Sequence, residues 1–262
     1  SSGLVSAEPS TGVVYWQFSN TAGSAPITTA AAPLASSSGQ VFVLDGDGTL
    51  HALDSCSGEI LWSLGNVGGD GSDLLATEGL VFLTDPANEL LRAVEVATGI
   101  VSWTRKIGNF ASPGIALAYD QLLVFFRGDS AASVSALDPG TGSDIWQAFD
   151  SAGMPSYGLV ANNHVYFYNS GSQRIRVLDA FRGTVLESIS QEGVRGLSAA
   201  NGALYVLLDG QIDVYEPSFE IYLAQVADGG GASTLITLVN REAATAQGTV
   251  EFFDDGGQPL PL

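Results

Sequence analysis

The amino-acid sequence predicts an all-β protein, a β-propeller of four-stranded blades, and three observations lead to this prediction. An eleven-residue phrase recurs as SAEPSTGVVYW, ALDSCSGEILW, AVEVATGIVSW and ALDPGTGSDIW. Its acidic position falls at Glu8, Asp54, Glu95, Asp138, Asp179 and, in a weaker copy, Glu216. The resulting unit of about 40 residues suits four short strands with tight turns, which is one propeller blade. The text between the phrases consists of short apolar runs bounded by Gly, Asp and Asn, as is typical of strands.

Each element of the phrase has a predicted structural role. The Ser/Thr-Gly pair, as in Ser57-Gly58, Thr98-Gly99 and Thr141-Gly142, is expected to make the hairpin turn into the outermost strand, because glycine adopts positive φ without a Cβ clash. The acidic residue before it can accept hydrogen bonds from the turn amides. The phrase ends on the four tryptophans of the chain, Trp16, Trp62, Trp103 and Trp146. Burying an indole of roughly 200 Å² contributes about 5 kcal/mol before entropy is subtracted. We therefore expect these side chains to close seams between blades rather than to form a stacking platform for a sugar or cofactor.

The strand count predicts five to six blades. Four complete four-strand units extend from about residue 27 to residue 190, two strands precede them and three follow. Two plus three strands leave one too many for a single closing blade, so the chain either closes a five-bladed ring with a surplus strand or forms part of a larger ring. An open ring would leave unpaired strand edges. The repeat also weakens, with Arg182 in place of Thr and Glu187 in place of Trp, which indicates a seam that closes in a different way.

The sequence changes character near residue 218, which predicts two domains: residues 1–217 as the propeller and residues 218–262 as a short, incomplete β-sandwich-like segment. The second segment contains QVADGGG, LITLVN and FFDDGGQP. Through these patterns it resembles the opening of a β-sandwich module common in secreted bacterial proteins. Three strands are too few for a sandwich, which needs about seven. Truncation, docking on the propeller and completion by another chain all remain open.

The phrase A-x-D-x-x-T-G-x-x-x-W resembles the tryptophan-docking motif of the pyrroloquinoline-quinone-type propeller repeats, over roughly residues 1–217. This family has a branch of quinoprotein alcohol and glucose dehydrogenases, which bind the quinone and a calcium ion, and a non-catalytic branch that carries the repeat without a cofactor. The alcohol dehydrogenases cover the quinone with a disulfide between adjacent cysteines, whereas this chain has only Cys56, inside a turn, where we interpret it as a small filler residue. The resemblance assigns no calcium ligands here. It therefore favours the non-catalytic branch, with no cofactor.

Few side chains suggest chemistry of their own. His51 and His164 occur in separate strand segments, and we expect each to be a strand histidine with a satisfied partner rather than a base. Ser130 in GDSAAS lacks the strand-turn-helix context of a hydrolase nucleophile. No catalytic or cofactor-binding residue is predicted.

Two acidic loops are weak candidates for a divalent cation. Asp45 and Asp47 in LDGDGT have alternating carboxylates, but the same letters suit a hairpin turn, and no Glu follows at the twelfth position. Asp70 and Asp73 in GGDGSD fit a flexible acidic loop. We therefore predict no metal-binding residue.

Composition limits the partners. The chain has 28 acidic and 9 basic residues, a formal net charge of −19, so it would repel a nucleic-acid backbone. No run of 18 apolar residues predicts a spanning helix. An extracellular or periplasmic location rests on the family resemblance alone.

Three functions follow as hypotheses. The first is a non-enzymatic exported propeller that acts as a protein-binding or scaffold module. The second is a structural subunit of an extracellular assembly, in which a neighbouring chain completes the C-terminal strands. The third is a fragment of a quinoprotein dehydrogenase, which added quinone and calcium would reveal.

Overall fold

Every regular element that the structure describes is a β-strand. The computed structural model describes residues 4–18, 34–69, 71–127, 131–151 and 155–215. The chain divides into two compact units, residues 1–217 and residues 218–262. All described residues lie in the first unit, so the expected β-sandwich-like segment lies outside the described residues and stays a prediction.

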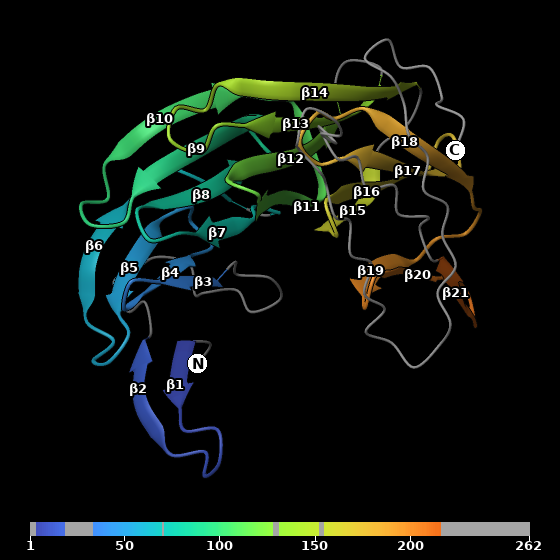
Figure 1. The fold of residues 1–262 in the computed structure, drawn as a ribbon. Helices are drawn as coiled ribbons and strands as arrows, with labels where there is room; N and C mark the ends of the chain where they lie inside the picture. The colour runs from blue at the N-terminus through green and yellow to red at the C-terminus, as the bar shows by residue number, and fades with distance from the viewer. Residues whose placement is uncertain (1–3, 19–33, 70, 128–130, 152–154, 216–262) are drawn as a thin grey trace, which may run out of the picture. The chain divides into compact units, whose positions relative to one another are not determined.

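The strands form six antiparallel sheets, each of which follows the chain order (Figure 1). The first sheet pairs β1 (Leu4–Ala7) with β2 (Val14–Phe18). The second contains β3 (Leu34–Ser37), β4 (Gln40–Leu44), β5 (Leu50–Asp54) and β6 (Ile60–Leu64). The third contains β7 (Leu74–Ala76), β8 (Leu80–Asp85), β9 (Leu90–Glu95) and β10 (Val101–Lys106).

The remaining sheets repeat this plan. The fourth contains β11 (Asn109–Ala118), β12 (Gln121–Arg127), β13 (Ala131–Leu137) and β14 (Asp144–Ser151). The fifth contains β15 (Pro155–Ala161), β16 (His164–Asn169), β17 (Arg174–Asp179) and β18 (Val185–Ser190). The last contains β19 (Gly196–Ala200), β20 (Ala203–Leu207) and β21 (Ile212–Tyr215). The predicted all-β fold of four-stranded blades is confirmed, and the described residues contain two strands before four complete units and three after them.

The first strands of successive sheets contact one another: β3 with β7, β7 with β11, β11 with β15, and β15 with β19. The fourth strand of each complete sheet is therefore the one farthest from these contacts, and it has a free edge within its own sheet. This is the blade arrangement of a propeller, in which each sheet faces its neighbours. How the ring closes stays a prediction.

Each outermost strand carries a β-bulge just before its tryptophan position. In β6, Trp62 pairs with Ala52 while Ile60 pairs with Leu53, so Leu61 is the extra residue. The same shift occurs in β2, β10, β14 and β18. A bulge bends the strand and increases its twist, and it is the reason that the three residues before the tryptophan do not alternate simply between two faces.

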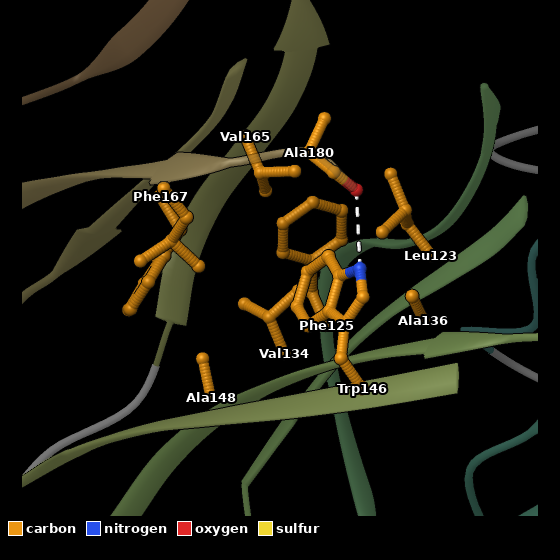
Figure 2. Close-up of a cluster of buried hydrophobic side chains, with 10 residues drawn as sticks. Leu123, Phe125, Val134, Ala136, Trp146, Ala148, Val165, Phe167 and Ala180 are labelled. Atoms are coloured by element: carbon orange, nitrogen blue, oxygen red, sulfur yellow. Dashed lines mark hydrogen bonds between the residues drawn. The ribbon is translucent and has the colours of Figure 1, made fainter. Parts of the chain in front are cut away.

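The apolar core is divided among the seams rather than gathered at one centre. Five clusters of buried side chains each join residues of two successive sheets. Figure 2 shows one of them, where Trp146 of β14 and Phe125 of β12 pack with Val165 and Phe167 of β16. The stability of the first unit therefore depends on contacts between neighbouring blades.

Candidate functional site

Every tryptophan of the phrase reaches across a seam to the next sheet. Trp62 Nε1 donates a 2.8 Å hydrogen bond to the carbonyl of Val96, in the turn between the third and fourth strands of that sheet. The corresponding carbonyls belong to Ser55 for Trp16, Pro139 for Trp103 and Ala180 for Trp146, at 2.9–3.1 Å (Figure 2). We call each such turn a seam turn; the turns comprise residues 55–58, 96–99, 139–142 and 180–183. The indoles serve as structural wedges, as the sequence indicated.

An aspartate before a seam turn holds that turn in shape. Asp54 Oδ1 accepts hydrogen bonds from the backbone N–H groups of Cys56 and Ser57 at 3.0 and 2.8 Å. The backbone and hydroxyl hydrogen bonds from Ser57 are the main reason that the pKa of Asp54 is lowered. Cys56 is exposed, so its side chain fills no space, and the interpretation as a filler residue is wrong.

Glutamate at the same position behaves differently. Glu95 Oε2 accepts a 2.7 Å hydrogen bond from the hydroxyl of Thr98, and Glu8 likewise accepts from Thr11. In the described residues, neither glutamate accepts a hydrogen bond from a turn amide as Asp54 does. The longer side chain carries the carboxylate beyond the turn and leaves part of it available to other groups.

The weakened repeat still closes one seam in the standard way. Although Arg182 replaces Thr, its N–H donates to Asp179, and Trp146 packs against Gly183. The following seam has Glu187 in the tryptophan position, and its cluster contains tyrosines instead, namely Tyr157, Tyr166, Tyr168 and Tyr215. The change predicted from the sequence therefore occurs at the seam between the fifth and sixth sheets.

His51 is a strand histidine with satisfied partners, as predicted. Its Nε2 lies 2.9 Å from Asp45 Oδ2 and its Nδ1 lies 2.8 Å from the hydroxyl of Ser63. Asp45 is buried, and its Oδ1 accepts from the N–H groups of Asp47 and Thr49 in the hairpin turn. The carboxylate of Asp45 is thus used by its own blade.

Two arginines occupy the position of His51 in other sheets. Arg92 donates to Asp85 at 2.8 Å and to the carbonyl of Val67 across the seam at 2.6 Å. Arg176 reaches Asp150 of the preceding sheet at 2.7 Å. Burial by itself raises the pKa of Asp150, but the hydrogen bonds from Arg176 and Asn169 outweigh it and hold the pKa below its usual value.

Sequence reasoning missed these ion pairs, yet a signal for them exists. A basic residue stands three positions before the acidic residue of the phrase at His51, Arg92 and Arg176. Because this spacing fixes the register on the third strand, all three point to the same kind of buried carboxylate. The pairs link groups within a blade and between neighbouring blades.

The other candidates are separated in the structure. Asp73 is partly buried and accepts a hydrogen bond from the N–H of Gly114, and burial raises its pKa. His164 begins β16, beside Tyr166. Asp70 and Ser130 lie outside the described residues. Within the described residues, no three His, Cys, Asp or Glu side chains gather as metal ligands.

A pocket of about 520 Å³ lies at the seam between the second and third sheets. It is lined by the turn from β3 to β4, the turn from β7 to β8, the seam turn that follows β9, and Ser102 of β10. The described residues of its lining include two carboxylates, those of Glu78 and Glu95, and no Lys or Arg. The pocket therefore presents negative charge.

The outermost strands expose apolar side chains at their bulges. Ile60 and Leu61 are 53% and 50% exposed. We call the exposed apolar residues in the three positions before each tryptophan, or before Glu187, the rim row; they are Val13, Val14, Tyr15, Ile60, Leu61, Ile100, Val101, Ile145, Val185 and Leu186. The row recurs in five successive sheets because it belongs to the variable positions of the repeated phrase.

Comparison with known proteins identifies the family. Residues 1–229 match the family described as the outer membrane protein assembly factor BamB. The chain belongs to this family. The resemblance to pyrroloquinoline-quinone-type propeller repeats, predicted from the phrase, is thereby confirmed. No curated protein matches the chain closely enough to count as a relative.

Several solved structures are similar to this chain. BamB from Moraxella catarrhalis is 19% identical, with a TM-score of 0.44 over 82% of this chain and 78% of that one. The quinohemoprotein alcohol dehydrogenase ADHIIG from Pseudomonas putida HK5 is 12% identical, with a TM-score of 0.49 over 69% and 41%. The computationally designed Ika8 protein is 15% identical, with a TM-score of 0.44 over 71% and 70%. In the described part of the chain, no helical segment has the length and apolar character needed to cross a bilayer.

Proposed function

We propose that this chain is a non-enzymatic propeller module that binds another protein in an exported assembly. The observation that carries the proposal is the rim row, in which five successive sheets expose apolar side chains at the same place. Exposed apolar surface that recurs in a regular pattern is typical of protein interaction sites. A partner that covers several positions of the row would gain contact area from each blade.

The bulges indicate how the partner binds. A bulge disrupts the hydrogen-bonding edge of a strand, and proteins use it to prevent another strand from pairing there. Leu61 is the extra residue of its bulge and is half exposed. We therefore expect the partner to pack side chains against the rim row rather than to add a strand to β6.

The family supports the nature of the partner and the location. Its description names a factor for the assembly of outer membrane proteins, so a polypeptide handled in that assembly is the partner class that we propose. We propose an extracellular or periplasmic location, which the family description supports. Arg92 and Arg176 are engaged in ion pairs with buried carboxylates within and between blades, and His51 is hydrogen-bonded to a buried carboxylate, which fits a binding module better than a catalyst.

Photo-crosslinking at the rim row tests the proposal. A benzophenone amino acid replaces Leu61 in the chain expressed in its own cells, and the crosslinked partner is identified by mass spectrometry. The control position is Thr104, an exposed polar residue of β10. Affinity for the purified partner is then measured for the wild type and for Leu61→Ser, which we expect to bind at least fivefold more weakly.

The outcomes separate the three functional hypotheses. One polypeptide that crosslinks at position 61, not at position 104, and binds the Leu61→Ser variant more weakly supports the proposal. A crosslink to a second copy of this chain would instead support the structural subunit. A stoichiometric absorbance change on adding pyrroloquinoline quinone and calcium would support the dehydrogenase fragment. Equal affinity of the wild type and the Leu61→Ser variant for the partner would refute the role of the rim row.

A further inference from the structure

We propose that the pocket between the second and third sheets binds an arginine side chain of the partner. The module would then recognise a partner segment in which a basic residue lies beside an apolar one. The inference rests on the proposed protein-binding function and adds the partner's chemistry. The pocket, of about 520 Å³, can hold a single long side chain but is small for a folded element. Glu78 and Glu95 supply its negative charge.

The carboxylate of Glu95 accepts fewer hydrogen bonds in the described residues than that of Asp54 does. At the same place in the preceding repeat, one carboxylate oxygen of Asp54 accepts hydrogen bonds from two turn amides and from the hydroxyl of Ser57. Among the described residues, the carboxylate of Glu95 accepts only the hydrogen bond from the hydroxyl of Thr98. Its second oxygen is therefore free to accept from a guanidinium, whose planar fork of N–H donors matches a carboxylate.

Neither acidic side chain is neutralised within the described part of the chain. The ion pairs found there involve other carboxylates, and no Lys or Arg lines the pocket. The hydroxyl of Ser38 donates to the carbonyl of Glu78 at 3.1 Å, which ties the two turns on either side of the pocket together. The two turns that line the pocket are thus held together, while the carboxylates of Glu78 and Glu95 have no ion-pair partner in the described residues.

A second observation concerns Gln40, which also lines the pocket. At the same repeat position, Gln121 Oε1 accepts a 3.0 Å hydrogen bond from Trp146 Nε1. Gln40 Oε1 is buried and accepts no hydrogen bond from the described residues, although a buried amide oxygen normally has a donor. A donor-rich side chain bound in the pocket would let this amide reorient and regain a partner.

The position of the pocket links it to the rim row. Ser102, the bulge residue of β10, lines the pocket, and it directly follows Ile100 and Val101 of the row. A partner segment with apolar side chains on the row could therefore place its next basic side chain between Glu78 and Glu95. The net charge of −19 favours the approach of such a segment.

The test uses two peptides that differ only in charge. Acetyl-Val-Arg-Val-amide and the same peptide with citrulline in place of arginine are titrated into the isotopically labelled full chain, and amide shifts of Gly79 and Ala97 are followed by NMR. We expect the arginine peptide to bind about fivefold more tightly, since an exposed ion pair has a modest effect. The difference should shrink at high salt because screening weakens it.

Three variants locate the effect. Glu95→Gln should remove the preference for arginine, and Glu95→Asp should do the same although it keeps the charge, because the shorter side chain is drawn into the seam turn as in Asp54. Glu8→Gln is the matched control, since Glu8 has the same position and the same threonine contact but does not line the pocket. This substitution should leave the affinity for both peptides unchanged.

Equal binding of the two peptides, or an arginine preference that survives Glu95→Gln and Glu78→Gln together, would overturn the inference. Folding of each variant is checked by its amide spectrum. The proposed function is tested by a different result, because it depends on partner binding at Leu61 and the rim row. Loss of partner binding in Leu61→Ser with no arginine preference would keep the function and reject the pocket.

Discussion

Trp62 lies directly on Gly99 of the next sheet. A Cβ atom added to Gly99 would stand 2.7 Å from Cε3 of the indole, and Trp62 Nε1 donates to the carbonyl of Val96 in the same turn. The glycine therefore has two functions, since its φ of +71° also shapes the turn. One residue of the phrase thus connects the turn of its own blade with the wedge of the previous blade.

Replacing the indole of Trp62 tests the hydrogen bond and the apolar packing of this contact together. We expect Trp62→Phe to lower the free energy of unfolding by roughly 1–3 kcal/mol, because the carbonyl of Val96 loses its donor and apolar contact area is lost. Urea denaturation measures the change. Tyr15→Phe, at an exposed residue of β2, is the control and should change stability by less than about 0.5 kcal/mol. Equal effects would show that the contact does not stabilise the seam.

The ion pair between Arg176 and Asp150 should matter more than that between Arg105 and Asp144. The side chain of Asp150 is 2% exposed, whereas that of Asp144 is 51% exposed. Arg176→Met leaves a buried carboxylate with weaker compensation, so we expect a loss of about 2–4 kcal/mol. Arg105→Met should cost at most about 1 kcal/mol. Thermal and urea unfolding of both variants checks the order, and a larger loss for Arg105→Met would contradict it.

Asp73 should make the first unit less stable as the pH rises through its folded pKa. Burial raises that pKa above the ordinary value of 3.8, so the folded chain binds the proton more tightly than the unfolded chain. The resulting cost is absent below the ordinary value and complete above the folded pKa. Asp73→Asn keeps an acceptor for the N–H of Gly114. The free energy of unfolding of this variant, minus that of the wild type, should therefore be larger at pH 7 than at pH 3. Stability curves at both pH values measure this, and a constant difference would refute it.

Much of the fold could be predicted because the phrase marks fixed places in each blade. The period located the sheets, and the tryptophans located the seams. The bulge at Leu61 could not be predicted, since the phrase fixes the number of residues before Trp62 but not their pairing. The exposure of the rim row depends on such bulges, so the sequence could not predict it either.

The candidate site was harder to predict because it combines turns from different sheets. Glu78 lies in a turn with no motif, and only the packing of β3 beside β7 brings it to the same pocket as Glu95. Arg176 and Asp150 likewise come from different sheets. Local patterns report turns and strands, whereas the partner of a charged side chain depends on which blades are neighbours.

The seam between blades is the central structural claim, and one comparison tests it most directly. Gly12 and Gly99 occupy the same place in the phrase and have the same φ of +71°, but no atom of the described residues lies within 4 Å of a Cβ added at Gly12. We predict that Gly12→Ala lowers the free energy of unfolding by about 1 kcal/mol, the cost of the backbone conformation alone. Gly99→Ala should cost at least about 2 kcal/mol more, because the indole of Trp62 must move. Equal losses in urea denaturation would contradict the claim that the tryptophan and the glycine together close the seam.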